Sequence, residues 1–427
     1  MPCSARLSSR RLRVIWVSSS KVGKEAKGAP PRIRELEGAA EGAEGGARGS
    51  EGGARGSEGA LPFEETARGA WKAESAQGSE GAQPSPGTAW DAESRARGAW
   101  VRRHLSGLLA GILFVVFALA LFVGRYPKPG FLNPAVMGSD PLARQIVFNS
   151  RLPRMLGAVV LGLVLGGAGA SLQAVFGNPL VDAGFLGVSQ GAAFGAAVAL
   201  VLGLRAYSLI AVLAFGMAVL ALALSLWLAE RFRYGGQILR LILAGLAVSA
   251  FFSSLLAMMK YVADPLSQLP DIVFWTMGSM VPMGWKRLES SAPIALAALA
   301  VLYAMRWRVN LLSLDDTVSH SLGIRPGVER KVVSVAAAAG VGVMTAVCGV
   351  VGWVGLVVPQ IVRAIDGPDG RSVLPRSMLG GAIFVLVSDT LARSLFSGEV
   401  PLGIVTSLFG ALSFAILLTV RKVELAR

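Results

Sequence analysis

The chain has 427 residues, of which 53% are hydrophobic and 16% are charged. Soluble globular domains average about 25% charged residues, so this composition excludes an ordinary soluble domain. The net charge of +14 would suit a nucleic-acid-binding protein, but beyond residue 104 the basic side chains lie in short segments between apolar runs. That placement is typical of membrane orientation, and we predict no nucleic-acid partner.

Residues 1–100 are predicted to form a disordered tail. From Glu44 the heptapeptide EGGARGS occurs twice in tandem, ending at Ser57, and Gly, Ala, Glu, Ser and Arg dominate the segment. Such a composition has no apolar face to offset the entropy of ordering. A second interpretation is that the true start lies near Trp100 and that the tail is mistranslated upstream sequence.

Residues 101–427 are predicted to form one all-α membrane domain. A helix needs about 20 apolar residues to cross a bilayer, and the apolar runs here are too long for barrel strands. We expect about ten spans, of which the eighth is short. They are Leu105–Val123, Met155–Phe176, Phe185–Leu204, Leu209–Leu228, Leu241–Met259, Leu288–Met305, Val332–Cys348, Val350–Ile365, Leu379–Leu395 and Leu402–Val420.

Small residues recur within the spans at helical spacing. Gly162 and Gly166 form one GxxxG pattern, and Gly191 and Gly195 form another. Helices in lipid associate through close backbone packing, which small residues permit. The pattern predicts a compact bundle.

The loop charges predict that both termini are cytoplasmic. Cytoplasmic loops carry an excess of Lys and Arg, and this orientation places Arg231, Arg325 and Arg371 inside the cell, among others. One outer loop breaks the rule with a positive cluster. Its members are Arg125, Lys128, Arg144, Arg151 and Arg154. A positive cluster on the wrong side of a membrane calls for a functional explanation.

Several stretches of the sequence resemble one transporter family. They begin with RLPRMLGAVVLGLVLGGAGASLQAVFGNPLVDAGFLGVSQGAAFG (151–195), LILAGLAVSA (241–250), FWTMGSM (274–280) and NLLSLDDTVSHSLGI (310–324). They continue with VGLVVPQIVRAIDGPDGR (354–371), SDTLAR (388–393) and VPLGIVTSLFGALSF (400–414). Together these motifs resemble the iron-siderophore, haem and cobalamin permeases of ABC importers, the FecCD type. The chain departs from the family at Gln360, Asp315 and Leu412, where His, Gly and Pro are common.

The resemblance implies the architecture of a type II ABC importer permease, with an inverted repeat of spans two to five and seven to ten. It implies a second copy of the chain, a cytoplasmic ABC ATPase dimer and an extracytoplasmic substrate-binding protein as partners, besides membrane lipid. The chain contains no GxxxxGK[ST] nucleotide loop, so we predict a transport subunit, not an enzyme, with ATP hydrolysis by the separate ATPase.

The segment from Ser313 to Gly323 is predicted to be a short helix. Ser313 is expected to cap its start, and Asp315 and Asp316 lie in its first turn, where carboxylates favour the helix dipole. In the resembling permeases this loop docks into the ATPase. The resemblance assigns that coupling role to Leu314, Asp316, Leu322 and Gly323.

The outer arginines gain a role from the same resemblance. Arg151 and Arg154 of RLPR, with Arg393 of SDTLAR, match positions that receive acidic residues of the binding protein. Arginine–carboxylate pairs are directional and often bidentate, which suits docking in register. Asp389 lies four residues before Arg393 and is expected to hold it in place.

The resemblance also marks structural positions. These are Gln173, Asn178, Pro179, Gly187, Gly245, Gly278, Pro359, Asp389, Pro401 and Gly403. Asn178-Pro179 and Pro359-Gln360 interrupt apolar stretches at corresponding places of the two halves, a common plan in transporters. The gate is expected where the fifth span begins, near Gln237–Arg240.

Two alternatives concern energy and cargo. A secondary transporter driven by an ion gradient would need carboxylates at mid-membrane, and Asp389 is the deep acidic candidate.

We expect no cofactor or metal, since Cys3, Cys348, His104 and His320 show no zinc-ligand spacing. The cargo is predicted to be an iron complex (siderophore or haem) or cobalamin, although an oxyanion also fits the scaffold.

Overall fold

The structure, a computed structural model, describes residues 88–124, 126, 130–133, 136–395 and 398–425. Most of the predicted tail, residues 1–87, lies outside this range. The described part is helical apart from one pair of short strands, β1 (Val123–Gly124) and β2 (Gly130–Phe131). The helices in the first half are α3 (Thr88–Phe122), α4 (Val136–Ser139), α5 (Pro141–Gln145), η2 (Ile146–Arg151), α6 (Leu152–Val175), η3 (Ala183–Leu186), α7 (Val188–Val201), α8 (Tyr207–Arg231) and α9 (Gln237–Val262). Those in the second half are α10 (Gln268–Thr276), α11 (Trp285–Ala304), α12 (Arg306–Leu312), α13 (Asp316–Ser321), α14 (Pro326–Cys348), α15 (Val354–Asp366), α16 (Gly370–Ser394) and α17 (Leu402–Leu425).

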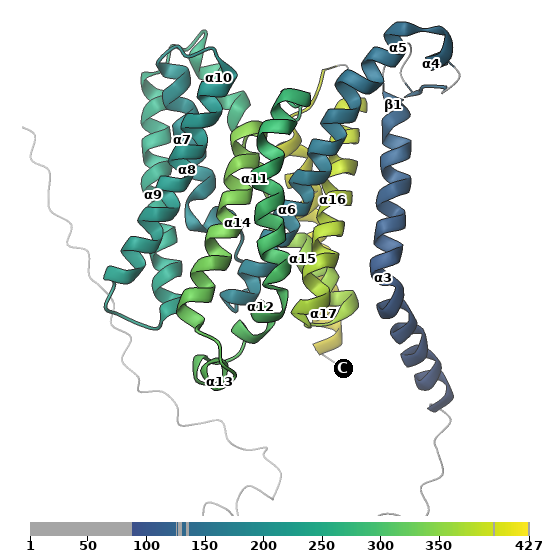
Figure 1. The fold of residues 1–427 in the computed structure, drawn as a ribbon, viewed down its shortest axis with the longest axis vertical. Helices are drawn as coiled ribbons and strands as arrows, with labels where there is room; N and C mark the ends of the chain where they lie inside the picture. Colours follow the sequence, from purple (N-terminus) through teal and green to yellow (C-terminus); the bar gives the residue numbers. More distant parts are fainter. Residues whose placement is uncertain (1–87, 125, 127–129, 134–135, 396–397, 426–427) are drawn as a thin grey trace, which may run out of the picture. The chain divides into compact units, whose positions relative to one another are not determined.

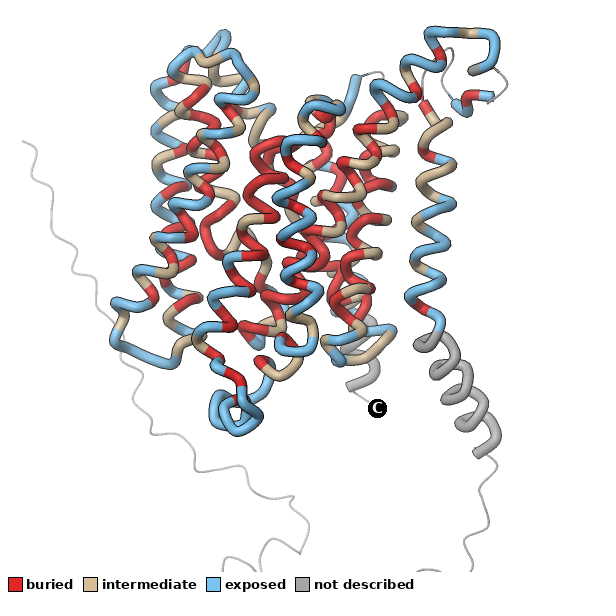
Figure 2. Tube along the Cα trace, in the orientation of Figure 1, coloured by how far each residue is buried: buried red, intermediate tan, exposed pale blue. Residues whose placement is uncertain are grey.

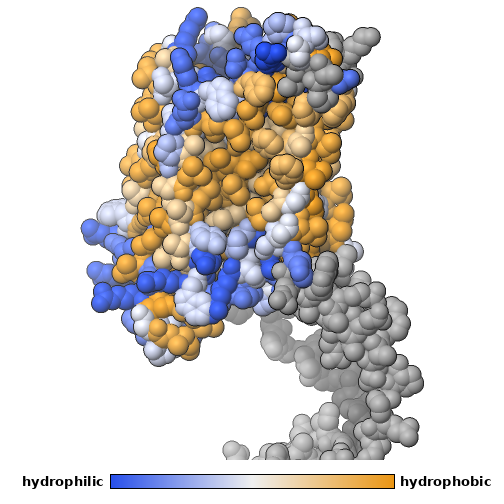
Figure 3. Space-filling model, turned by 45° about the vertical axis from the view of Figure 1, so that its right-hand side comes forward, coloured by the Kyte–Doolittle hydropathy of each residue, from blue (hydrophilic) through white to orange (hydrophobic). Residues whose placement is uncertain are grey.

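The predicted spans and the helices agree, and the expected class of membrane helix bundle is confirmed. Eight helical stretches of the described residues are long and apolar enough to cross a membrane, and each contains or overlaps a predicted span. The other two spans correspond to α7, with 14 residues, and α15, with 13. The surface shows the matching pattern, because an apolar band separates two hydrophilic ends (Figure 3).

The helix α3 begins earlier than the sequence indicated. It starts at Thr88, inside the segment predicted as a disordered tail, and runs without a break into the first span. Ala, Glu and Arg, which are good helix formers, dominate its first turns. Residues joined to an apolar span that is already helical extend that helix without the cost of nucleating a new one. The helix propensity of the tail residues, considered alone, does not include this effect.

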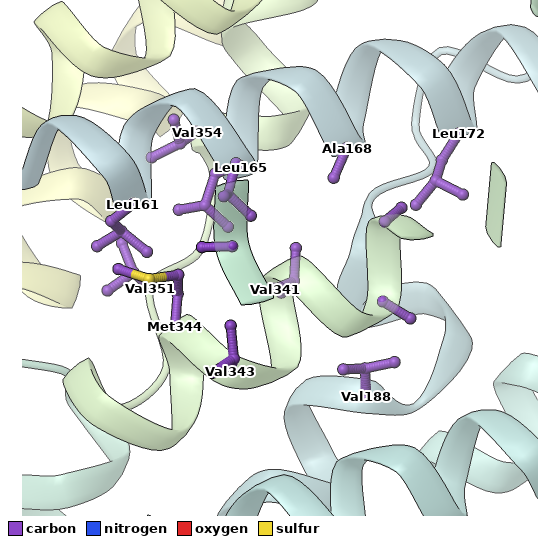
Figure 4. Packing of buried hydrophobic residues seen from close by; sticks show 14 of the residues in the cluster. Leu161, Leu165, Ala168, Leu172, Val188, Val341, Val343, Met344, Val351 and Val354 are labelled. Carbon is purple, nitrogen blue, oxygen red and sulfur yellow. The ribbon is translucent and has the colours of Figure 1, made fainter. Parts of the chain in front are cut away.

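Three helices form the centre of the bundle. Most residues of α6, α14 and α16 are buried, whereas α3, α9 and α17 expose much of their surface (Figures 1 and 2). Leu161 and Leu165 on one side of α6 point toward Val341 and Met344 of α14 in the core (Figure 4). The exposed apolar side chains of the outer helices suit contact with lipid.

The GxxxG patterns mark close helix contacts. A Cβ placed on Gly166 would lie 2.0 Å from the backbone oxygen of Ser377 in α16, and one on Gly162 would lie 2.3 Å from that of Gly381. In the other pattern, a Cβ on Gly195 would lie 2.4 Å from the oxygen of Leu213 in α8. The predicted close packing is confirmed, because these glycines let the backbone of the facing helix approach to a distance at which any side chain would collide with it.

The two short helices occupy corresponding positions in the chain. The long α6 is followed by the short α7 and then by the long α8 and α9, and the long α14 is followed by the short α15 and then by α16 and α17. This order of lengths is the one expected for the inverted repeat. Paired short segments in two halves are a known feature of transporter folds.

The short helices outside the spans escaped the sequence analysis. They include α5, α10 and α12, which have five, nine and seven residues. Helices of this length are marginal alone and take their stability from packing, so periodicity over so few residues gives little signal.

Candidate functional site

An ion cluster joins α6 to α16 at the end of the bundle that carries α4 and α5. Arg154, in the first turn of α6, donates through Nε and Nη2 to Oδ1 of Asp389 at 3.1 and 2.9 Å. Its Nη1 donates to Glu399, in the loop before α17, at 2.8 Å. The side chain of Asp389 has no exposed surface, while that of Glu399 is 43% exposed. The guanidinium of Arg154 is therefore shared between a buried and an exposed carboxylate.

Arg151 and Arg393 close the C-terminal end of α3. Arg151 donates to the backbone oxygen of Leu121 at 3.1 Å, and its guanidinium packs against Gly124. Arg393 donates to the backbone oxygens of Ala120 and Val123. The last carbonyls of a helix lack partners within the helix and carry partial negative charge, so two cations satisfy them well.

All three arginines expected to face a partner thus come together, but each has an internal contact. The docking role stays a prediction. The ion pair expected between Asp389 and Arg393 is present, with 3.9 Å between Oδ2 and Nε. The sequence analysis missed a second and closer partner of Asp389, because Nη2 of Arg154 lies 2.9 Å from its Oδ1. Arg393 is shared in turn, since its Nη1 and Nη2 donate to backbone oxygens at the end of α3 while its Nε faces Asp389.

The predicted coupling segment forms a knob at the opposite end of the bundle (Figure 1). The helix α13 starts at Asp316, and Asp315 caps it by accepting the backbone N–H of Thr317 at 3.2 Å. Ser313 was expected to be the cap and is not, since it ends α12 and donates instead to the oxygen of Asn310. Gly323 ends the segment with φ of +81°, a left-handed conformation that favours glycine.

The knob exposes apolar side chains. Leu314 is 44% exposed, Val318 45% and Leu322 54%. Neighbouring apolar side chains on a protruding helix, at an end of the bundle that is otherwise hydrophilic, are typical of a protein contact surface (Figure 3). Asp316 is 51% exposed as well, and it accepts a 2.6 Å hydrogen bond from the buried Arg330 of α14, which lowers the pKa of its carboxyl.

Three consecutive charged residues at the start of α14 escaped the sequence analysis. Glu329 accepts a hydrogen bond from Arg308 of α12 at 2.7 Å, Arg330 bonds to Asp316 of α13, and Lys331 pairs with Glu230 of α8. Sequence alone gives no signal for these pairs, because loop residues near a helix start are ordinarily solvated.

Polar side chains also connect the two halves of the bundle. Gln360 of α15 donates to Oε1 of Gln173 in α6 at 3.0 Å and to the backbone oxygen of Pro179 at 3.1 Å. Arg363 also donates to Gln173. The segments with Asn178-Pro179 and Pro359-Gln360 therefore meet. A cavity of about 420 Å³ lies beside them, and its lining includes Gln173, Asn178, Asn310 and Arg363.

The remaining motif positions lie at tight turns and contacts. A Cβ on Gly245 would lie 2.4 Å from the oxygen of Phe185, and Gly187 starts α7 with φ of +80°. Gly278 has φ of +71° and accepts the backbone N–H of Leu402, one residue after Pro401. Gly403 donates to the oxygen of Met277 at 3.0 Å. These residues hold the loop ends of the bundle together.

Comparison with known proteins gives a consistent set of relatives. A sequence model of the FecCD transport family matches residues 112–420. The molybdate import system permease protein MolB of Haemophilus influenzae is 36% identical over 72% of this chain and 92% of its own length. The Fe(3+) dicitrate transport system permease protein FecC of Escherichia coli is 35% identical over 73% of this chain and 95% of its own.

A further relative and a solved structure extend the set. The hemin transport system permease protein HmuU of Yersinia pestis is 36% identical over 62% of this chain and 80% of its own length. An inward-facing metal-chelate type ABC transporter has a solved structure that superimposes with a TM-score of 0.69 and 34% identity, covering 74% of this chain and 99% of that one.

Proposed function

The chain belongs to the FecCD transport family and is a multi-pass membrane permease of the ABC importer class, and we propose that it carries a metal chelate into the cell. The family match carries this conclusion, because it covers all ten predicted spans apart from the first residues of the first one. An ion-gradient-driven transporter is not supported. The relatives named above are import permeases, and the similar structure is an ABC transporter.

The knob around α13 supports docking of an ATPase. We propose that Leu314 and Leu322 insert into a groove of a cytoplasmic ATPase, while Asp316 and Gly323 fix the shape of the knob. The exposed leucines supply the apolar contact, and the cap at Asp315 with the turn at Gly323 keeps the short helix folded. ATP hydrolysis then belongs to the partner.

The other end of the bundle is proposed to receive a substrate-binding protein, with a second copy of the chain completing the importer. Arg154 is the best placed of the predicted docking arginines, because its partner Glu399 is partly exposed. Arg151 and Arg393 are buried against α3 and would support the surface from beneath. This division of roles refines the prediction made from the motifs.

The cargo is proposed to be an iron complex, either a siderophore or haem, or else cobalamin. The names of the dicitrate and hemin relatives favour iron. The molybdate permease has about the same sequence identity to this chain as the dicitrate and hemin permeases, and its name favours an oxyanion as a second candidate.

The test is transport in proteoliposomes that contain the permease together with an ABC ATPase and a substrate-binding protein from the same organism. Uptake of a ferric hydroxamate, haemin, cyanocobalamin and molybdate is compared with and without ATP. We expect ATP-dependent uptake of one iron complex or of cobalamin; molybdate uptake alone would establish the second candidate. Transport on an ion gradient without the ATPase would refute the importer.

Leu322→Glu should prevent co-purification of the ATPase, whereas Leu266→Glu, on a residue 92% exposed and outside the knob, should not.

A further inference from the structure

The start of α14 is bonded to four other helices. Glu329, Arg330 and Lys331 are consecutive, yet each pairs with a different element: α12, α13 and α8 respectively. Arg330 also reaches a fourth, since its Nη1 donates to Oε1 of Gln237, the first residue of α9, at 3.3 Å. The guanidinium of Arg330 therefore lies between the knob and the predicted gate.

Burial makes this guanidinium dependent on both partners. The side chain of Arg330 is 1% exposed, and its Nε has no hydrogen-bond partner among the described residues. A buried charge is costly unless it is paired and hydrogen-bonded. Asp316 supplies the opposite charge from α13, and Gln237 supplies a second acceptor from α9. If either element moved away alone, it would leave the cation less well satisfied.

The first turn of α9 contacts α14 through Gln237, whereas its Arg240 donates to the backbone oxygen of Phe232, at the end of α8, at 3.2 Å. The helix packs mainly on α7, α8 and η3. No side chain caps the N-terminus of α9. The amide of Gln237 instead packs against Gly327 of α14, since a Cβ added to Gly327 would lie 3.4 Å from Nε2 of Gln237. The side chain of Gln237 is thus committed to α14.

We infer that Arg330 is a positioning residue that links movement of the α13 knob to the first turn of α9. The inference rests on the proposed function, in which an ATPase displaces the knob. A 2.6 Å ion pair transmits a pull as well as a push, because separation would strand the buried guanidinium. The planar guanidinium bonds two acceptors at once, which an ammonium group does only with poorer geometry.

The experiment follows the first turn of α9 in the assembled complex. Leu239 is exposed there, and Leu239→Cys is introduced into the full chain with Cys3→Ser, leaving the buried Cys348. Maleimide labelling of this thiol is compared in the nucleotide-free and vanadate-trapped complex with the ATPase. We expect the two rates to differ by about fivefold or more, the lower range of coupling between sites. In Arg330→Met the difference is lost although the ATPase remains bound.

Matched variants keep the inference falsifiable. Lys331→Met removes the neighbouring charge, whose ion pair is solvent-exposed, and should preserve the difference. Asp316→Asn leaves Arg330 in place and should reduce the difference, so it decides the matter if Arg330→Met does not fold. Equal rates in the parent complex, or a full difference in both Asp316→Asn and Arg330→Met, would overturn the link. Failure of the ATPase to bind the parent protein would instead refute the proposed function.

Discussion

Single side chains carry unusually large roles at the two ends of this bundle. Asp389 is buried beside Arg154 and Arg393, and Arg330 is buried between Asp316 and Gln237. Removal of Asp389 would strand two largely buried guanidinium groups, and removal of Asp316 would strand the buried guanidinium of Arg330. Such sites are where a single substitution has its largest effect on stability.

The first residue-scale prediction concerns Asp389. Asp389→Ala leaves Arg154 and Arg393 without their buried counter-charge and is expected to destabilise the protein by about 3–5 kcal/mol. Glu399→Gln, at the exposed partner of the same arginine, should cost only about 0–1 kcal/mol. Thermal unfolding can be followed by a fluorogenic maleimide on the buried thiol of Cys348, in a Cys3→Ser background. Equal melting temperatures for the two variants would contradict the burial argument.

A pH prediction follows for Asp316. The hydrogen bond from Arg330 lowers the pKa of its carboxyl, so the pair stabilises the folded state above the ordinary carboxyl pKa of about 4. That stabilisation is lost as the pH falls through the lowered pKa. The anisotropy of a fluorophore on Val318→Cys should therefore stay constant from neutral pH to about pH 4 and fall below it. In Arg330→Met the pair is absent, so the anisotropy should already be low at neutral pH and should show no further fall near pH 4. A profile identical to that of the parent would count against the pair.

At the scale of elements, the sequence predicted the spans well and the pairings poorly. Ten apolar runs corresponded to ten helices because the bilayer imposes length and composition on each run separately. The pair between Asp389 and Arg393 could be predicted from their spacing on one helix, but the pair between Arg154 and Asp389 could not, since these residues are 235 apart in the chain. The cap of α13 was misplaced for a local reason: Ser313 and Asp315 are both good caps, and only the end of α12 decides between them.

The element-scale prediction tests the contact between α6 and α16. Gly166→Val places a side chain where the oxygen of Ser377 already lies, so the helices must separate, at a cost of about 1–3 kcal/mol or more. Gly216→Val in α8 meets no atom within 4 Å and serves as the control. Monodispersity in size-exclusion chromatography should be lost in the first variant and kept in the second. A monodisperse Gly166→Val protein would show that the helices tolerate a wider spacing.

For the whole molecule, the arrangement of ends bears on orientation. The start of α3 and the C-terminal end of α17 lie at the same end of the bundle as the α13 knob (Figure 1). The positive loops predict that this end is cytoplasmic. An ATPase needs the knob on the side where ATP is present, so the proposed function requires the same orientation.

Orientation is tested with two single cysteines in a Cys3→Ser background. Tyr261→Cys replaces a side chain that is 90% exposed at the far end of α9, and Val318→Cys replaces one on the knob. In intact cells a membrane-impermeant maleimide should label Cys at position 261 and label position 318 only after permeabilisation. The reverse pattern would invert the orientation and, with it, the assignment of both docking surfaces.

The clasp that Arg151 and Arg393 form on the end of α3 has a practical consequence for protein engineering. The two guanidinium groups find their acceptors in the final carbonyls of that helix. A shortened polypeptide that dispensed with this outermost helix would remove those acceptors from both guanidinium groups and expose them at the side of the bundle. Trimming the protein for crystallisation or display should therefore stop short of α3, however peripheral it looks.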